Sequence, residues 1–558
     1  MEEQFDFIIV GAGSAGCVLA DRLTADGRFR VLLLEAGGSD KRLFVQMPAG
    51  LGQVFYDPKV NWCYEAEPCQ QMGGRTDFWP RGKVLGGSSS INGMVYIRGQ
   101  REDFDDWARL GNPGWGYDDV LPYFRRSEDN DLGEDAWRGG GGPWKISSIA
   151  GREQPVVRLA LDAAMARGWP ANPDFNGERQ EGVGLYQFSF RKGRRTSSAT
   201  AFLDPAKKRV NLTVVTKALA TRVLFEGREA VGVEYRHGGR TLTARARREV
   251  ILAGGAVNSP LLLELSGIGD GARLQLHGIP VVHHSPMVGE NLQDHVFTGF
   301  TYRTAIPTLN DSLNSLPKIL FHGARYLFTR TGPLTFGINQ GGAFVRTRPD
   351  QPRPDTQLYF IPLSFQAPAK GKSATGLRAH PFSGMTINAS PCRPESRGAI
   401  HIRSADPDAP PVIHRNYLAT ENDVRTMIDS LRLADAVAHT QPLAGVVEER
   451  LFLPQGPLSD EQIEQWARQT GRTTYHPTST CTMGPDPERS VVDPQLRVHG
   501  TSRLRVIDAS IMPLIVSGNT NAAATMIGEK GRRPGAGRPH LTPGRTTDDH
   551  SPGPHRQG

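Results

Sequence analysis

Three glycines and a glutamate near the start of the sequence have the types and spacing of a nucleotide site. The glycines follow an apolar segment, residues 5–10, and the acid ends a second one, residues 31–35; the positions are Gly11, Gly13, Gly16 and Glu35. Such glycines permit a tight turn, close approach of backbone to a diphosphate and close helix packing, while the acid accepts from a ribose hydroxyl. The pattern predicts a dinucleotide site but does not distinguish NAD from FAD.

A second glycine-rich segment, residues 81–99, reads RGKVLGGSSSINGMVYIRG. Its adjacent glycines, three serines and asparagine form a loop of small hydrogen-bonding groups, which suits a flat polar ring or a diphosphate. A flexible linker is the alternative interpretation. The aromatic residues that follow, up to Phe124, are typical of a segment that packs against a core, so they disfavour a linker.

Two segments near the C-terminus carry side chains that could orient or deprotonate a ligand. Asn519 and Asn521 stand on a turn of small residues before AAATMIGEK, which predicts the start of a packed helix. His476 lies in TTYHPTST, where Pro477 and the hydroxyl side chains indicate a rigid loop. Imidazole can accept a proton near neutral pH, although a lone histidine of this kind is more often structural.

The elements that must position these residues belong to a large globular protein. Its 558 residues exceed one ordinary core and predict two domains, or one domain inserted into another. Hydrophobic residues make up 38% and charged residues 22%, which are ordinary globular values. The apolar segments around the first glycines predict strands, and the apolar spacing from Cys17 to Leu23 predicts an amphipathic helix between them.

Charge and cysteine content exclude several classes of protein. The formal charge is +7, but residues 531–558 hold five Arg against two Asp and leave only +4 elsewhere, with no basic stripe for nucleic acid. The cysteines are odd in number, lack metal-type spacing and predict reduced thiols without a metal site: Cys17, Cys63, Cys69, Cys392 and Cys481. The start lacks a basic region, and no apolar run reaches about 18 residues, so we expect a cytoplasmic protein with no signal peptide or membrane span.

Several blocks, in order from Phe5 to Lys530, resemble the glucose-methanol-choline (GMC) oxidoreductases, and among them the bacterial choline-dehydrogenase-like alcohol dehydrogenases. After the first motif they read GKVLGGSSSINGMVYIRG, GGAVNSPLLLELSGIG, VGENLQDH, YHPTSTCTMG and VIDASIMPLIVSGNTNAAATMIGEK. The resemblance implies an enzyme that oxidises an alcohol by hydride transfer to N5 of FAD. It also implies an α/β fold, α+β overall, in which a discontinuous Rossmann-like FAD domain holds a substrate domain built on an antiparallel sheet backed by helices.

The resemblance divides the chain and assigns cofactor contacts. The FAD-binding domain would comprise residues 1–150, 196–297 and 477–530, and the substrate-binding domain residues 151–195 and 298–476. Relatives with a covalent flavin in this loop have histidine where this chain has Ile91, so the resemblance implies noncovalent FAD. Predicted cofactor contacts, with Val223 by the adenine, are Gly11, Gly13, Ser14, Gly16, Glu35, Gly86, Gly87, Ser88, Asn92, Gly93, Val223, Asp508, Ala509, Asn519 and Thr520.

The resemblance places the chemistry on His476 and Asn519. Alcohol oxidation requires a base within about 3 Å of the hydroxyl and donors for the developing alkoxide. His476 would be the base, while the Asn519 amide would donate to the alkoxide and its carbonyl would accept from the substrate hydroxyl. An Asx-type turn is the alternative for Asn519, and both uses can coexist. His295, in NLQDH, is predicted to be structural near the flavin.

The substrate is predicted to be an uncharged primary alcohol, aliphatic or aromatic. Choline-specific relatives need an anionic or aromatic cage, and TFGINQGGAFVR offers Gln340 where an acid is expected. Residues 315–334 could form an apolar wall or a surface-lying amphipathic helix, which suggests peripheral contact with the inner face of a membrane. Electrons would pass to a quinone or other carrier; alternatives are an oxidase using dioxygen, a choline dehydrogenase, a hydroxynitrile lyase and a noncatalytic flavin scaffold.

The tail, residues 531–558, differs in composition from the predicted helix before it. It holds six Gly, five Pro and one large aliphatic residue, Leu541, which predicts disorder. One interpretation is a basic tail for an anionic partner. Another is a shifted reading frame, because one G inserted after an AAG codon for Lys530 would turn Lys-Ala-Ala-Asp-Leu into the Lys-Gly-Arg-Arg-Pro found here.

Overall fold

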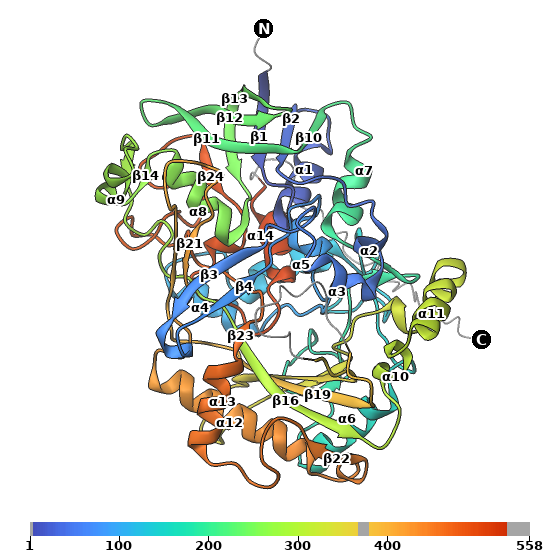
Figure 1. Ribbon diagram of the computed structural model, residues 1–558. Coiled ribbons are helices and arrows are strands. Elements are labelled where there is room, and N and C mark those ends of the chain that lie inside the picture. The colour runs from blue at the N-terminus through green and yellow to red at the C-terminus, as the bar shows by residue number, and fades with distance from the viewer. Residues whose placement is uncertain (1–3, 367–378, 533–558) are drawn as a thin grey trace, which may run out of the picture.

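A computed structural model describes residues 4–366 and 379–532 of the chain. Two large β-sheets lie at opposite ends of this part of the molecule, and Gln4, the first described residue, belongs to the first sheet (Figure 1). The predictions of disorder and of a shifted frame concern residues 531–558. Of these, residues 533–558 lie outside the described residues.

The first sheet is the mixed, largely parallel sheet expected of a nucleotide-binding domain. In spatial order its strands are β10 (Leu212–Thr216), β2 (Val31–Glu35), β1 (Gln4–Val10), β13 (Arg240–Leu252), β12 (Glu229–His237) and β11 (Ala218–Glu226), and β24 (Leu504–Val506) also pairs with β13. The pairs around β1 and β2, and the pair of β13 with β24, are parallel. The pairs among β11, β12 and β13 are antiparallel.

Two helices that begin at predicted motifs pack against each other beside this sheet. Helix α1 (Ser14–Thr24) follows the first glycines, and α14 (Asn521–Lys530) follows the small-residue turn. Small side chains allow the close packing, because a Cβ on Gly528 would lie 2.9 Å from the Cα of Ala15. The two ends of the described chain are therefore joined at the nucleotide motif.

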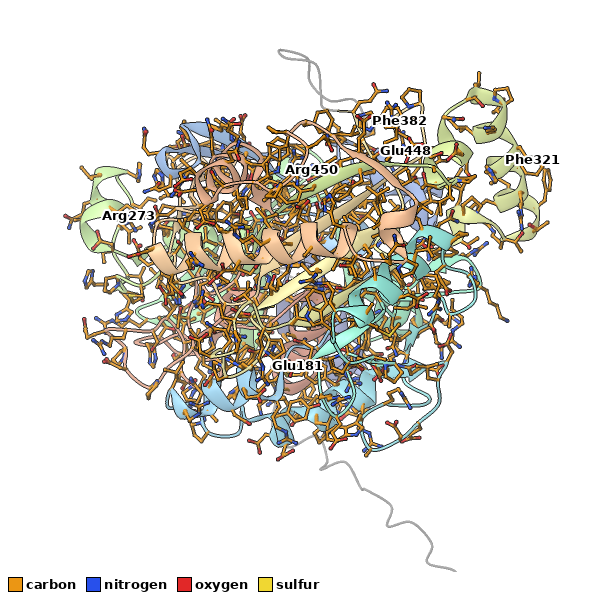
Figure 2. The ribbon with its side chains drawn as sticks, turned by 90° about the horizontal axis from the view of Figure 1, so that it is seen from below. Glu181, Arg273, Phe321, Phe382, Glu448 and Arg450 are labelled. Carbon is orange, nitrogen blue, oxygen red and sulfur yellow. The ribbon has the colours of Figure 1, made fainter. Side chains whose placement is uncertain are left out.

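The second sheet is antiparallel throughout and is covered by helices. In spatial order its strands are β22 (Val447–Arg450), β16 (Val296–Thr304), β19 (Gly384–Pro391), β18 (Thr356–Ile361), β17 (Gly341–Val345) and β7 (Gly182–Leu185), and β23 (Arg472–Thr473) also pairs with β16. Helices α6 (Pro155–Ala166) and α12 (Glu421–Ala438) pack on it, and α13 (Asp460–Thr470) contacts β16. Figure 2 views this end from below, with a long helix crossing in front of the strands. The predicted fold class is confirmed.

The other strands and α-helices link the two sheets or pack around them. They are α2 (Leu43–Gln46), α3 (Leu51–Val54), β3 (Tyr64–Cys69), β4 (Arg75–Trp79), α4 (Arg101–Arg109), α5 (Tyr117–Ser127), β5 (Glu128–Asn130), β6 (Trp144–Ile146), β8 (Phe190–Arg191), β9 (Arg194–Arg195), α7 (Asp204–Ala206), α8 (Gly255–Leu265), β14 (Ile268–Gly269), α9 (Gly271–Leu276), β15 (His283–His284), α10 (Leu309–Leu313), α11 (Leu316–Thr329), β20 (Ala399–His401) and β21 (Val412–His414). Among the described helices, none has the length and apolar character needed to cross a membrane.

Each large sheet carries its own apolar core. Ile8, Leu33 and Val250 are fully buried on the first sheet, and Phe300 and Leu358 are fully buried on the second. Burial of one such side chain contributes about 1.5–3 kcal/mol. The first sheet draws its strands from segments assigned to the FAD-binding domain, whereas the second draws nearly all of its strands from the other segments; the domain boundaries themselves stay a prediction.

Candidate active site

A cavity of about 1000 Å³ extends from the nucleotide motif to the two predicted catalytic residues. At one end it is lined by Val10 and Leu34, at the carboxyl ends of β1 and β2, which is where α/β sheets bind ligands. His476 and Asn519 also line it. The structure therefore brings the predicted cofactor and catalytic positions into one space.

Most of the predicted cofactor contacts lie on the cavity wall. Among them, the lining residues are Gly11, Gly13, Ser14, Glu35, Gly87, Ser88, Asn92, Gly93, Asp508, Ala509, Asn519 and Thr520. Gly16 and Gly86 lie just behind this wall: a Cβ on Gly16 would lie 1.9 Å from the Gly11 carbonyl oxygen, and the Gly86 N–H donates to the Ala12 carbonyl at 2.7 Å. Their role is to let the wall form.

The glycine wall fits a diphosphate. Gly11 has a φ of +103°, and a Cβ there would lie 2.5 Å from the Ala253 carbonyl oxygen. A Cβ on Gly87 would lie 2.8 Å from the Cα of Gly13. Helix α1 begins at this wall without a side-chain cap, so the positive end of its dipole faces the cavity. These backbone surfaces would cradle the diphosphate of FAD.

Glu35 is held in place by backbone donors. Its two carboxylate oxygens accept from the N–H groups of Ala12 at 2.9 Å and Gly37 at 2.8 Å. Burial raises the pKa of Glu35 to about 7, against these two hydrogen bonds and the nearby Lys83, which lower it. A carboxylate oriented in this way has lone pairs left for ribose hydroxyls.

Val223, predicted to lie by the adenine, does not face the cavity. It is 3% exposed, and its N–H donates to Ser266 Oγ at 2.8 Å. The cavity is lined instead by Ala218, Leu219 and Ala220, at the start of the same strand. The residues of this strand that line the cavity thus lie upstream of Val223, and the adenine contact itself stays a prediction.

Two predicted positions at the flavin end differ in what they do. Ile91 lies on the cavity wall, and its hydrocarbon side chain cannot form a bond to a flavin. Asp508 is buried and occupied by the protein, because its carboxylate accepts from the Gly255 N–H at 2.9 Å, Ser259 Oγ at 2.6 Å and the Ser510 N–H at 2.8 Å. Asp508 therefore ties the start of α8 to the loop after β24 and shapes the wall.

The loop that carries His476 is clamped by a buried acid. The His476 N–H donates to Asp294 Oδ1 at 2.9 Å, and Thr473 Oγ1 and the Tyr417 hydroxyl donate to Asp294 Oδ2, the first at 2.6 Å. Tyr475, directly before the histidine, has a φ of 69°, in the left-handed region. Asp294 was not singled out in the sequence; its only signal was its place in the NLQDH block.

Hydrogen bonds define which nitrogen of His476 carries its proton. His295 Nε2 lies 2.8 Å from the Cys392 carbonyl oxygen, which can only accept, so this nitrogen is the donor. His295 Nδ1 is then an acceptor and receives the proton of His476 Nδ1 at 3.0 Å. Neutral His476 therefore keeps an unprotonated Nε2, which lies 3.1 Å from Asn519 Nδ2.

Both histidines are neutral at pH 7. Burial lowers the pKa of His476 well below its ordinary value of 6.5, and the nearby His295 and Arg81 lower it further. Burial lowers the pKa of His295 to about 4. A neutral His476 with a lone pair on Nε2 can act as a base without first losing a proton. His295 is not among the residues that line the cavity and acts through His476.

The turn that carries Asn519 is held in place by hydrogen bonds to Asp103. Asp103 accepts the Ser517 N–H at 2.6 Å and its hydroxyl at 2.9 Å, and Gly518 adopts a φ of +111°. The Asn519 carbonyl oxygen accepts from Gln357 Nε2 at 3.3 Å, so Nδ2 is the atom turned toward His476. The predicted donor role fits this geometry. The carbonyl, predicted to accept from substrate, accepts from Gln357 and keeps a second lone pair, so that role stays a prediction.

The wall near His476 is apolar and cationic. Phe55 and Tyr475 meet edge to face with ring centroids 4.9 Å apart, and Arg81 donates to the Tyr475 carbonyl at 2.7 Å. All three line the cavity. Gln340 does not, since it is fully buried and accepts from the Gln154 N–H at 2.8 Å.

Helix α11 lies apart from the cavity. No residue of α11 lines the cavity, so of the two interpretations of residues 315–334 the surface helix is the one the structure supports. Within residues 4–366 and 379–532, no group of three His, Cys, Asp or Glu side chains is placed to hold a metal ion.

Known proteins of similar sequence and structure indicate the family of this chain. The model of the family described as GMC oxidoreductase matches residues 5–297 and, with its C-terminal part, residues 394–528. The chain is 42% identical to the mitochondrial choline dehydrogenase of Homo sapiens over 548 residues, 97% of this chain and 91% of that protein. It is 43% identical to an oxygen-dependent choline dehydrogenase of Pseudomonas entomophila over 552 residues, covering 96% and 95%. The crystal structure of pyridoxine 4-oxidase from Mesorbium loti matches with a TM-score of 0.84 and 31% identity, covering 94% of this chain and 98% of that one.

Proposed function

Since the chain belongs to the GMC oxidoreductases and is an FAD-dependent alcohol oxidoreductase of that family, we propose that it oxidises an uncharged primary alcohol to the aldehyde. The family, enzyme class and cofactor are those predicted from the sequence. The observation that carries the proposal is the unprotonated Nε2 of a neutral His476, 3.1 Å from the Asn519 amide at the cavity.

The two side chains divide the work on the substrate oxygen. FAD, when bound, supplies the acceptor for the hydride, at flavin N5. An alcohol oxygen that enters between His476 Nε2 and Asn519 Nδ2 would replace their mutual hydrogen bond. His476 Nε2 then takes the hydroxyl proton while Asn519 donates to the oxygen as negative charge develops. These two roles commonly account for about 10²–10⁴ and 10²–10³ in rate, respectively.

The wall beside the base favours an uncharged substrate. Phe55 and Tyr475 offer aromatic surface for an aliphatic or aromatic alcohol, while Arg81 would repel a cation. Choline dehydrogenation is the second candidate, because the curated relatives named above are choline dehydrogenases. An anaerobic panel that compares benzyl alcohol, short aliphatic alcohols and choline at the flavin absorption band tests the choice. Bleaching by choline but by none of the uncharged alcohols would overturn the proposal of an uncharged substrate.

The electron acceptor is proposed to be a quinone or another carrier. The crystallised relative from Mesorbium loti is named an oxidase, so dioxygen is the alternative acceptor. Oxygen uptake by the alcohol-reduced enzyme at a rate that matches turnover would favour the oxidase. A hydroxynitrile lyase would leave the flavin oxidised when the alcohol is added.

FAD is proposed to be bound without a covalent link, as Ile91 on the wall suggests. Acid precipitation of the holoenzyme should release the yellow cofactor into the supernatant. Flavin that stays with the washed protein pellet would contradict the proposal.

The location is proposed to be cytoplasmic, with helix α11 resting on the inner face of a membrane. Six large apolar side chains of α11 are 45–87% exposed: Leu316, Ile319, Leu320, Phe321, Leu327 and Phe328. Lys318, Arg325 and Arg330 add positive charge beside them, and α11 contains no acidic residue. Figure 2 shows Phe321 on a helix that stands out from the body. Apolar surface next to basic residues suits an anionic bilayer.

Vesicle binding tests this surface. We expect the holoenzyme to float with phosphatidylglycerol vesicles and less with phosphatidylcholine vesicles, and the pair L320E and F328E to abolish flotation without changing turnover in solution. Leu276→Glu is the matched control, because Leu276 is 86% exposed on α9, across the molecule from α11 (Figure 1). Equal loss of flotation in both proteins would remove α11 from the proposal.

A further inference from the structure

Two side chains of strand β18, Gln357 and Tyr359, carry buried polar groups behind the cavity wall. Gln357 is 2% exposed and Tyr359 is 4% exposed, and neither lines the cavity. Because they stand two residues apart on one strand, they share a face of the sheet. A buried amide costs free energy unless it is hydrogen-bonded. Its partners therefore indicate what the amide is for.

These side chains continue the hydrogen-bonded series that ends at the base. The Cys392 carbonyl can only accept, so each later link can run in one direction only. From that carbonyl outward, the links join Cys392, His295, His476, Asn519, Gln357 and Tyr359. Every donor in the series points toward Cys392. The orientation of the Asn519 amide is thus one member of a single consistent set.

Two tyrosines fix the orientation of the Gln357 amide. The Tyr359 hydroxyl donates to Gln357 Oε1 at 2.8 Å, so the amide nitrogen must face the other way. That nitrogen donates to Asn519 Oδ1 at 3.3 Å and to the Tyr186 hydroxyl at 3.2 Å. The Tyr186 hydroxyl is free to accept because it donates its own proton to the Leu358 carbonyl at 2.6 Å.

The neighbouring strand leaves room for this arrangement. Gly342 on β17 pairs with Tyr359, and a Cβ there would lie 2.4 Å from the Tyr186 hydroxyl and 1.9 Å from the Leu358 carbonyl oxygen. Any larger residue would displace the tyrosine that receives the Gln357 proton. Gly342 is therefore part of the arrangement that orients the Gln357 amide.

We infer that Gln357, held by Tyr359, is a positioning residue that turns the donor side of Asn519 toward the substrate oxygen. The inference rests on the proposed function, in which Asn519 Nδ2 donates to the developing alkoxide. With the amide turned over, Asn519 Oδ1 would face the lone pair of His476 Nε2, and the alkoxide would lose its donor. Gln357 supplies the partner that makes the productive orientation the stable one.

The sharpest test converts the amide into an acid of the same shape. In Gln357→Glu the protonated carboxyl can still donate to Asn519, whereas the ionised carboxylate can only accept and turns Asn519 over. The rate of anaerobic flavin reduction by alcohol should therefore fall as pH rises through the pKa of the new acid. At high pH the loss should approach about 10²–10³, the effect of losing one such donor.

The titratable groups around position 357 do not change charge in this range, so the fall in rate can be assigned to the new acid. Burial raises the pKa values of Tyr186, Tyr359 and Cys392, so these groups stay neutral through the range tested. His476 is already neutral there, because its pKa is lowered. Gln340→Glu is the control, since it places a carboxyl at another buried glutamine that does not contact Asn519. It should show no fall in rate with rising pH.

Two further variants separate positioning from packing. Gln357→Met keeps the volume but removes the donor, and should slow flavin reduction about tenfold at every pH with little change in KM. Tyr359→Phe should slow it a few-fold and should add only a small further loss in the Gln357→Met background, because Tyr359 orients the Gln357 amide and also contacts Asn519 itself. Neither variant should alter the FAD content.

The outcomes distinguish this inference from the proposed function. If alcohol does not reduce the wild-type flavin, or if H476A reduces it as fast, the proposed function fails. If those tests succeed but Gln357→Met and Gln357→Glu both react at the wild-type rate at all pH values, Gln357 only fills space and the inference is overturned. A loss of rate that persists undiminished in an Asn519→Ala background would also overturn it.

Discussion

The two ends of the cavity are built in opposite ways. At the nucleotide end, Glu35 meets the Ala12 N–H from only 23 residues away, and the wall is largely backbone that glycines leave bare. At the alcohol end, His295 and His476 are 181 residues apart, and Gln357 and Asn519 are 162 apart. The first end depends on local chain shape. The second depends on the direction of hydrogen bonds between side chains from distant segments.

This contrast predicts different sensitivities. A substitution at the alcohol end should change the rate of the chemical step and leave the cofactor in place, because the cradle is formed elsewhere. A substitution at the nucleotide end should change cofactor affinity and leave the chemistry of the loaded enzyme intact. Variants at each end, assayed for both reaction rate and FAD content, show whether the two ends are separable.

The largest effect is expected at the base. His476→Ala should retain FAD but slow anaerobic flavin reduction by about 10²–10⁴, because the positioned acceptor for the hydroxyl proton is lost. Stopped-flow spectroscopy of the FAD-loaded variant measures the rate. Near-wild-type reduction would remove His476 from the mechanism, and loss of FAD would show that the ends are not separable.

A smaller loss is expected for the donor. Asn519→Ala should slow reduction by about 10²–10³, as expected when one donor to a developing oxyanion is removed. The same stopped-flow assay applies, with FAD content measured in parallel. If only FAD affinity changed, Asn519 would be a cofactor contact, and of the two proposed catalytic residues only His476 would remain.

Cofactor affinity should depend on pH through Glu35. The folded pKa of this acid is raised to about 7, and ribose hydroxyls would stabilise its ionised form. FAD should therefore bind the apoprotein up to about tenfold more weakly at pH 6 than at pH 8. Fluorescence titration measures this change, and Glu35→Gln should remove the pH dependence while leaving turnover of the loaded enzyme unaltered. If Glu35→Gln lowered the turnover of the loaded enzyme more than it lowered FAD affinity, the assignment of Glu35 to the ribose would be contradicted.

The smallest effect is expected from pH on the wild-type base. Since the pKa of His476 is lowered well below 6.5, flavin reduction should be nearly constant between pH 8 and 6.5 and should fall only at lower pH, as the imidazole gains a proton. The same sign applies to stability, which should fall below pH 6.5 as the unfolded chain binds protons that the buried imidazole rejects. A reduction rate that halves near pH 7.5 would count against a neutral, buried base.

How much could be predicted follows the same division. The strand, glycines, helix and acid at Gly11 to Glu35 are a local pattern, so their arrangement was predictable from spacing alone. The strand that carries Val223 was predicted, but which of its residues faces the cavity depends on strand register and packing. The tautomer of His476 and the orientation of Asn519 depend on Cys392 and Gln357, and no local pattern connects these residues.

Two features of the fold show why the resemblance gave more than periodicity could. The antiparallel sheet of β16 to β19 draws its strands from segments separated by surface helices, and no short-range signal indicates their pairing. Asp294 and Asp103 clamp the catalytic loops by accepting backbone N–H groups, a role that many buried acids could play in an isolated sequence. Only the fold shows which loops they hold.

The most direct test of the account is the reaction of the holoenzyme with a primary alcohol and with the same alcohol deuterated at the reacting carbon. Under anaerobic conditions the flavin band should bleach with the ordinary alcohol and bleach several-fold more slowly with the deuterated one, because the C–H bond breaks as His476 takes the hydroxyl proton. A flavin that stays oxidised with every alcohol tested, choline included, would contradict the account.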